Sequence, residues 1–413
     1  MIRGLLKFLG AAAALLWLSG CASYASRVRL PRAEYEAGQY DAAIKELTAL
    51  ADRHDNDELL YLLDLGMAYH TSGDYASAVK TFQRAEDFAE RKDYTSISQE
   101  AGSVLLNDQV KVYKGEDFEK VLINVYKAID YTMMNQWDDA LVECRQVDRK
   151  IDMLISAGKI KYDKNPFAKY LAAALFEARG EYDDAFVDYR QLFDWIGGGF
   201  PYLGGPLLRM AIRAGDSEDF DDYRKKLGRV PPYKLGPNQG EVVVILEQGR
   251  APLKMPSPNF RLIPVFRHRY YSSDYAWLDD NQTHDVARTD TLFDIERAAV
   301  QELDQKLNLI IAKKIGGMVV KGAVAYGVAR ATHSAALGYM TDWLLNAADE
   351  ADLRSWTTLP AHLQIARFPV NAGRQDISLD MVGLSGAETP SVKKWTVDVK
   401  PGQMVFLDYR SRG

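Results

Sequence analysis

The sequence predicts two structural parts, an N-terminal array of helical hairpins and a C-terminal β-rich domain that carries an inserted helical pair. Three observations support this α plus α+β fold class. A short turn motif recurs in the first half, a stretch rich in proline and glycine follows at 228–240, and alternating apolar residues come after it. The 413 residues are 47% hydrophobic and 26% charged, which is ordinary globular composition. The net charge of −6 offers no basic footprint for nucleic acid.

The first residues have the layout of a secretory signal peptide. Two basic residues precede an apolar stretch that is short and interrupted for a membrane span. Residues 18–21, Leu-Ser-Gly-Cys, look like a bacterial lipobox, in which the signal is cut before a cysteine that is then acylated. We therefore expect a signal peptide at 1–20, a lipid on Cys21 and a lipidated tether over 21–30. A single-pass anchor helix is the alternative.

Acylation of the cysteine predicts where the protein resides. Several acyl chains on one residue give stable membrane anchoring. By resemblance to the sorting rules of Gram-negative bacteria, Ala22 is not the aspartate that favours retention in the inner membrane. We expect a palmitate-type lipid anchor in the outer membrane, facing the periplasm. Cys144 is the second of the two cysteines and is expected to be a small core residue.

The recurring motif consists of a turn residue, a polar residue, an aromatic residue, two further positions and an alanine. Gly or Asn ends a helix in the left-handed conformation, and alanine permits two helices to approach closely. Each motif therefore predicts the turn of a helical hairpin, and a weaker hairpin is expected over 207–227. The motif reads GQYDAA at 38–43, GDYASA at 73–78, NQWDDA at 135–140 and GEYDDA at 180–185.

The residues around the second motif resemble the tetratricopeptide (TPR) repeat, a 34-residue unit of paired helices. Gly66 and Tyr69 precede the motif, and Ala78, Phe82 and Ala85 follow it at helical spacing. The resemblance is strong at 58–90, good at 167–193 and degenerate at 120–150. The first unit is partial, because Pro31 falls inside its expected first helix.

A TPR-like helical repeat domain over 31–228 implies an extended concave face of the kind that binds peptides or proteins. The alternative is that the array merely spaces the second domain from the membrane. The residues expected to meet a partner are Tyr69, Tyr75, Trp137, Phe176 and Tyr182.

A change of periodicity marks the second domain. A linker is expected over 229–240, followed by a β-rich domain over 241–413 with a helical insertion at about 286–350. The segment at 241–249 is a β-branched run that predicts a buried strand. Further strands are expected at 355–370, 377–384, 393–400 and 402–410, and a helix at 286–313.

The segment 315–346 is rich in Gly, Ala and aliphatic residues. Small residues allow neighbouring helices to approach closely, as in membrane helix dimers. We expect a buried helical hairpin here, with two alternatives: a surface that docks on a partner or bilayer, and a transmembrane role. Lys321 and Arg330 argue against a true span.

Catalytic and metal-binding motifs are scarce. The six histidines form no HExxH pattern and lie near no CxxC pattern, so we expect no metal site and no cofactor. The basic and aromatic run at 267–271 is expected to be the polar edge of a strand. The rival hypothesis is an enzyme that acts on envelope polymers, with a site around Arg267, His268 and His362.

Several sequence segments together resemble a family of bacterial TPR-containing outer-membrane lipoproteins for which no catalytic activity is established. They lie at 106–131, 165–190, 241–254 and 351–373 and keep their order along the chain. The resemblance implies lipidation, repeats and a shared C-terminal domain.

The last of these segments contains a candidate docking junction formed by Arg354, Trp356 and Arg367. Trp356 is expected to plug the junction between the inserted helices and the following strand. The two arginines are expected to pair with carboxylates of the repeat array and to fix the angle between the domains.

We therefore expect a non-enzymatic outer-membrane lipoprotein. It would act as a protein–protein interaction scaffold, or as an assembly or secretion accessory factor, with another envelope protein as its partner.

Overall fold

The computed structural model describes residues 24–95, 111–158, 164–228, 230, 234–280, 286–332, 334, 350–383 and 388–411. The expected signal peptide and Cys21 lie outside these residues. So do residues 335–349 of the expected helical insertion and most of the segment between the second and third predicted hairpins.

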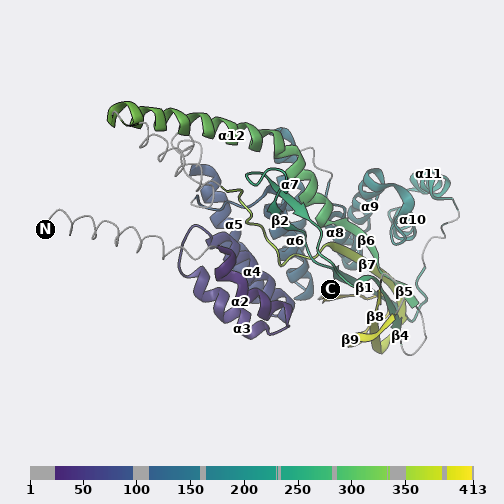
Figure 1. The fold of residues 1–413 in the computed structure, drawn as a ribbon. Helices are drawn as coiled ribbons and strands as arrows, with labels where there is room; N and C mark the ends of the chain where they lie inside the picture. Colours follow the sequence, from purple (N-terminus) through teal and green to yellow (C-terminus); the bar gives the residue numbers. More distant parts are fainter. Residues whose placement is uncertain are drawn as a thin grey trace.

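The N-terminal part is a helical repeat array of successive hairpins (Figure 1). The turns between the helices of a pair carry left-handed residues at Gly38, Gly73, Asn135 and Gly180, which are the positions that the recurring motif predicted. The motif alanines are fully buried between the helices. The helices are α2 (Tyr24–Glu36), α3 (Tyr40–Ala51), α4 (Glu58–Ser72), α5 (Tyr75–Thr95), α6 (Asp117–Met133), α7 (Trp137–Ser156), α8 (Pro166–Arg179), α9 (Tyr182–Ile196), the short 3₁₀ turn η4 (Gly197–Gly199), α10 (Gly204–Arg213) and α11 (Ser217–Leu227).

Helix α2 corrects the expected tether, and it contains Pro31 as the sequence indicated. It begins at Tyr24, so residues 24–30 are helical and are not a tether, and it continues through Pro31. Proline removes one intrahelical hydrogen bond, but tertiary contacts offset that cost. Val28 is buried, and Arg32 forms a 2.9 Å ion pair with Asp64 of α4.

The C-terminal part contains two four-stranded sheets and a separate hairpin. In the first sheet the order is β10-β1-β7-β6, with β1 parallel to β10 and antiparallel to β7. The second sheet has the order β5-β4-β8-β9, and β2 pairs with β3. The strands are β1 (Gln239–Gln248), β2 (Leu253–Pro256), β3 (Pro264–Arg267), β4 (Ser273–Asp280), β5 (Val286–Arg288), β6 (Asp290–Asp294), β7 (His362–Asn371), β8 (Gly373–Gly383), β9 (Glu388–Val399) and β10 (Met404–Arg410).

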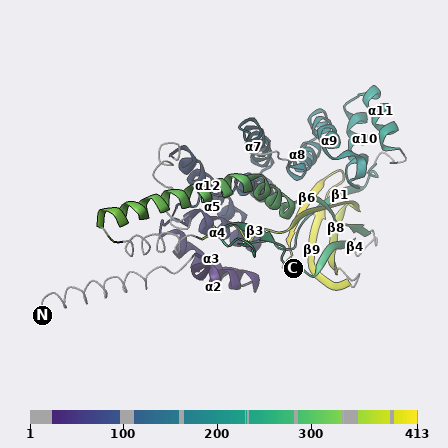
Figure 2. The ribbon, with the colours of Figure 1, turned by 45° about the horizontal axis from the view of Figure 1, so that its top comes forward.

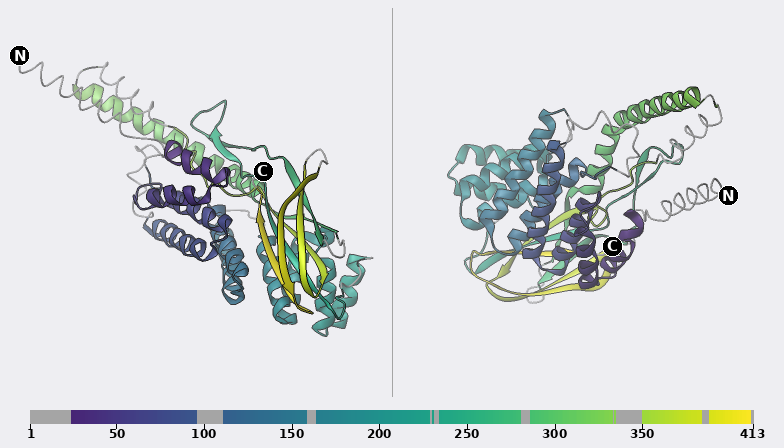
Figure 3. Two further views of the ribbon diagram at one scale, coloured as in Figure 1. Left: turned by 90° about the horizontal axis from the view of Figure 1, so that it is seen from below. Right: turned by 90° about the vertical axis from the view of Figure 1, so that its left-hand side faces the viewer.

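The first sheet is the middle layer between the helices and the second sheet (Figures 2 and 3). Successive side chains of a strand point to opposite faces. Val243 and Ile245 of β1 accordingly join the core shared with the helices, whereas Val242 and Val244 join the core shared with the second sheet. Burial on both faces explains why β1 is an almost continuous apolar run.

Helix α12 (Ile295–Thr332) corrects the expected insertion. The predicted helix over 286–313 starts later, because residues 286–294 instead form β5 and β6, which pair with β4 and β7. The helix then continues through Gly316 and Gly322 to Thr332. The second half of the expected hairpin lies outside the described residues. Its far end projects beyond the rest of the described chain (Figures 1 and 3). Among the described residues, no helix combines the length and apolar character needed to cross a bilayer.

Trp356 connects the C-terminal part to the repeats and is 1% exposed. Its ring centroid lies 5.8 Å from that of Phe82 in α5 and 5.7 Å from that of Tyr126 in α6. The side chain thus fills the space between two repeats, not the junction with the inserted helix that the sequence suggested.

We expect Trp356→Ala to lower the free energy of unfolding by about 3–5 kcal/mol, because it leaves a large cavity in the shared core. Phe260→Ala is the control: that side chain is 62% exposed, so the change should stay within about 0.5 kcal/mol. Urea unfolding followed by circular dichroism measures both. Equal effects of the two substitutions would contradict this packing.

Candidate functional site

The charged residues of the first sheet lie on the face that meets the helices. Glu241 and Glu247 share the alternation of Val243 and Ile245 along β1, and Asp408 shares that of Met404 along β10. Such buried charges require partners. The helical array supplies them in several polar clusters, which form the candidate site.

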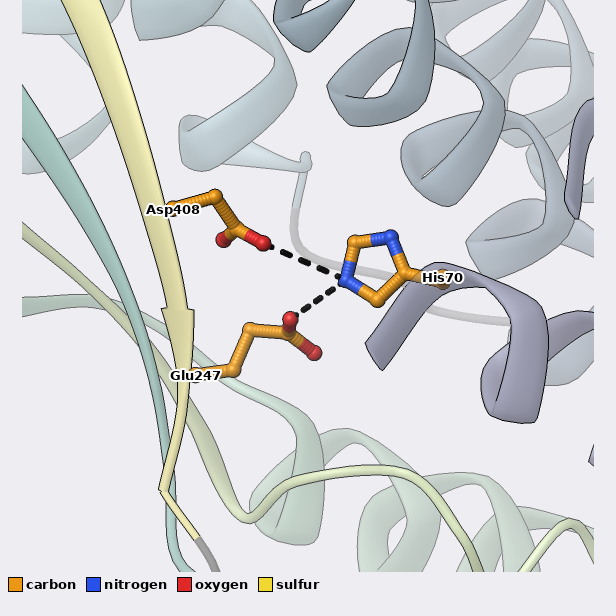
Figure 4. Close-up of side chains that lie close together, drawn as sticks. All are labelled: His70, Glu247 and Asp408. Carbon is orange, nitrogen blue, oxygen red and sulfur yellow. Dashed lines mark hydrogen bonds and ion pairs between the residues drawn. The ribbon is translucent and has the colours of Figure 1, made fainter. Parts of the chain in front are cut away.

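The central cluster, called here the His70 cluster, contains His70 of α4, Asp130 of α6, Glu247 of β1 and Asp408 of β10. His70 Nδ1 lies 2.5 Å from Asp130 Oδ1, and His70 Nε2 lies 2.6 Å from Glu247 Oε1 and 3.5 Å from Asp408 Oδ2. Figure 4 shows the imidazole directed at both strand carboxylates. The Tyr126 hydroxyl donates to the second oxygen of Glu247 at 2.6 Å.

Burial and charge compete in the His70 cluster. Burial by itself would lower the pKa of His70, but Glu247 and Asp130 raise it well above its ordinary value. Burial and the neighbouring Glu247 raise the pKa of Asp408 to about 8, and burial raises the pKa of Asp130 to about 6. The ring can therefore donate from both nitrogens, or it can present Nε2 to a cation. His70, Glu247 and Asp408 each offer one such ligand atom, all within 4.8 Å of one another.

The Arg367 cluster joins β1 and β7 to helices α8 to α10. Arg367 Nη2 lies 2.8 Å from Glu177 of α8, and its Nε lies 2.7 Å from Glu241 of β1. Arg209 of α10 contacts the same two carboxylates, and Arg367 also donates to the Tyr189 hydroxyl at 2.8 Å. The predicted pairing of this arginine with a carboxylate of the repeat array is confirmed.

The second predicted pairing is also confirmed, because Arg354 Nη1 lies 2.9 Å from Asp57. Next to it, the backbone N–H of Trp356 donates to Glu119 of α6 at 2.6 Å. Burial and Glu116 raise the pKa of Glu119 to about 7. Arg354, Trp356 and Arg367 are each at most 5% exposed, so the surface of this chain does not present them for docking.

A last cluster attaches α12 to the repeats. Glu302 accepts hydrogen bonds from the backbone N–H groups of Asp117 and Phe118, at 2.8 and 2.7 Å, and so caps α6 from outside. Glu116 contacts Lys254 of β2 and Lys306 of α12. Although burial opposes it, these two ammonium groups lower the pKa of Glu116 to about 2.

The five repeat aromatics expected to meet a partner are all half-buried: Tyr69, Tyr75, Trp137, Phe176 and Tyr182. The ring centroid of Trp137 lies 6.1 Å from that of Phe406 in β10, and Tyr182 lies beneath Arg213. Phe176 packs against the shared core. On the expected concave face, the Trp137 position is thus covered by a strand of the same chain.

The residues of the rival enzyme hypothesis differ in exposure and in their hydrogen-bond partners. Arg267 ends β3 and is exposed. His268 contacts Glu296 with 78% of its side chain exposed, whereas His362 Nδ1 lies 2.8 Å from Gln248 Oε1. The two histidines thus have different partners.

Sequence reasoning missed the His70 cluster. Its members are separated by up to 338 residues, and histidine motifs detect only near neighbours in sequence. The available signal was a titratable residue at the end of an apolar run: Glu247 ends the run of β1, and His70 lies near the end of α4.

No protein-family model matches the chain, and no curated protein matches it. Among solved structures, the chain is similar to MamA from Desulfovibrio magneticus RS-1, at 16% identity over 49% of this chain and 93% of that one, with a TM-score of 0.32. A kinesin light chain from Podosopora anserina with nearly identical TPR-like repeats aligns at 14% identity over 49% of this chain and 92% of that one, with a TM-score of 0.33. Both TM-scores are below 0.5, so neither likeness carries an argument about this chain.

We expect Arg367→Ala to lower the free energy of unfolding by about 3–5 kcal/mol, because it leaves Glu177 and Glu241 buried with too few cations. Arg190→Ala is the matched control. Its side chain is 42% exposed and its pair with Asp219 is 3.4 Å long, so the loss should be below about 1 kcal/mol. If the two substitutions cost the same in urea unfolding, the Arg367 cluster does not join the two parts.

Proposed function

We propose that this protein is a non-enzymatic lipoprotein of the outer membrane that faces the periplasm and acts as a scaffold for another envelope protein. The sequence supports the anchor through its lipobox at 18–21. The fold supports the scaffold, because the repeat array and the first sheet share one hydrophobic core.

The exposed apolar side chains of α12 are the observation that best supports the scaffold proposal. Ile315, Val319 and Tyr326 are 54%, 69% and 68% exposed. Together with Gly322, they follow one stripe of the helix at spacings of four, three and four residues. A Cβ atom added at Gly322 would meet nothing within 4 Å, so a second helix can approach closely there. The proposed occupant is a helix of the partner protein.

The position of α2 fits a short anchor. Only two residues separate Cys21 from Tyr24, where α2 begins. A chain of three residues spans at most about 10 Å, so a lipid on Cys21 would hold the helical array close to the membrane surface.

The enzyme alternative gains no support from the described residues, because His268 and His362 contact different partners. A membrane-inserted role for 315–346 gains none from the described part of α12, which does not qualify as a span.

Site-specific photo-cross-linking in intact cells tests the proposal, with the photoreactive residue at Val319 and a control at Val187, which is 48% exposed on α9. We expect one adduct from position 319 that mass spectrometry identifies as an envelope protein. The yield of this adduct should fall at least tenfold in Tyr326→Glu, because a carboxylate would interrupt the apolar stripe. Cys21→Ser should release the protein from the outer-membrane fraction and abolish the adduct.

Two outcomes would contradict the proposal. An adduct formed only within the chain would mean that the apolar stripe packs against another part of the same molecule. A Cys21→Ser protein that stays in the outer membrane and still forms the adduct would exclude the lipid anchor.

A further inference from the structure

We propose that His70, Glu247 and Asp408 bind one divalent transition-metal ion, with Zn²⁺ as the best match, where α4 meets β1 and β10. Imidazole nitrogen and carboxylate oxygen are common zinc ligands. The three ligand atoms already lie within 4.8 Å of one another (Figure 4). This inference does not depend on the proposed scaffold function.

The distances between the ligand atoms suit such an ion after a small adjustment. Two ligands bound at about 2.1 Å in tetrahedral geometry lie about 3.4 Å apart. His70 Nε2 and Asp408 Oδ2 are 3.5 Å apart, whereas His70 Nε2 and Glu247 Oε1 are 2.6 Å apart. A rotation of the Glu247 side chain that moves Oε1 by less than about 1 Å would widen its distance to His70 Nε2 enough for an ion. The two atoms now share a hydrogen bond. The ion replaces the proton of that bond.

The surroundings of His70 are those of a metal-bound histidine. Metal-ligating histidines usually donate their second ring N–H to a carboxylate, which fixes the tautomer and the ring orientation. Asp130 Oδ1 occupies this position, 2.5 Å from Nδ1. The second oxygen of Glu247 is likewise held, by the Tyr126 hydroxyl at 2.6 Å.

Unpartnered oxygens at the cluster give independent support. Within the described structure, Asp408 Oδ1 and Asp130 Oδ2 are buried and accept no hydrogen bond. The side chains concerned are only 5% and 0% exposed. Three carboxylates face one imidazole, and Arg410 Nε is 4.0 Å from Glu247. A divalent cation would offset the excess negative charge, and Asp408 Oδ1 or a water would complete its coordination.

The site also indicates what the ion would do. Its ligands come from the repeat array and from two parallel strands of the first sheet, so a bound ion cross-links the two parts. Because the three side chains are buried, the ion would enter most readily while the array closes on the sheet during folding.

The test uses the full chain, solubilised in detergent, unfolded, freed of metal with a chelator and refolded with or without Zn²⁺. After gel filtration, elemental analysis should find about one zinc per chain bound during refolding, and Co²⁺ in place of Zn²⁺ should give a visible absorption spectrum typical of a tetrahedral site. Asp408→Asn and His70→Gln should each weaken Zn²⁺ binding by tenfold or more. Asp130→Asn should weaken it by about 10–100-fold through the orientation of the ring.

His54→Gln is the matched control, because His54 is an exposed histidine with a carboxylate 3.0 Å away, on Glu58. It should leave zinc binding unchanged. Asp408→Asn keeps the size of the side chain, and circular dichroism checks that this variant folds. The proposal is overturned if the wild-type chain binds no zinc, or if folded Asp408→Asn binds zinc as tightly as the wild type does.

Discussion

The constraint on which the rest of the structure depends is that strand β1 is buried on both faces while it carries glutamates at both ends of its apolar run. Removing a carboxylate from water costs several kcal/mol unless cations and hydrogen-bond donors replace the water. Glu241 meets Arg367 and Arg209, and Glu247 meets His70 and Tyr126. Arg209, His70 and Tyr126 belong to the helical array. Separating β1 from the helices would therefore leave the Glu241 and Glu247 carboxylates without these partners.

This constraint changes the expected use of the repeats. A TPR-like array commonly offers its inner face to a peptide. Here β1 and β10 lie on that side, and the Val243 and Ile245 side chains complete the core of the helices. The partner proposed above would accordingly bind an outer surface, and the exposed apolar stripe of α12 is the surface proposed for it.

Local sequence signals predicted the parts of the fold that depend on local physics. The turn motifs predicted the left-handed residues between paired helices. The β-branched run at 241–249 predicted β1, and the later alternating segments predicted β8, β9 and β10. Predictions were wrong where distant segments decide the outcome. Residues 286–294 form strands rather than a helix because β4 and β7 supply the pairing. The His70 cluster was not predictable from spacing, since His70 and Glu247 are 177 positions apart.

Native-state hydrogen exchange is the most direct test of the claim that the array and the first sheet form one cooperative unit. The backbone amides of α4 and α6 and those of β1 and β10 should exchange with the same opening free energy, which should equal the global free energy of unfolding. The same amides should lose protection together in Arg367→Ala. If the helices keep full protection while the strands open at much lower free energy, the buried charges do not join the two parts and this account is wrong.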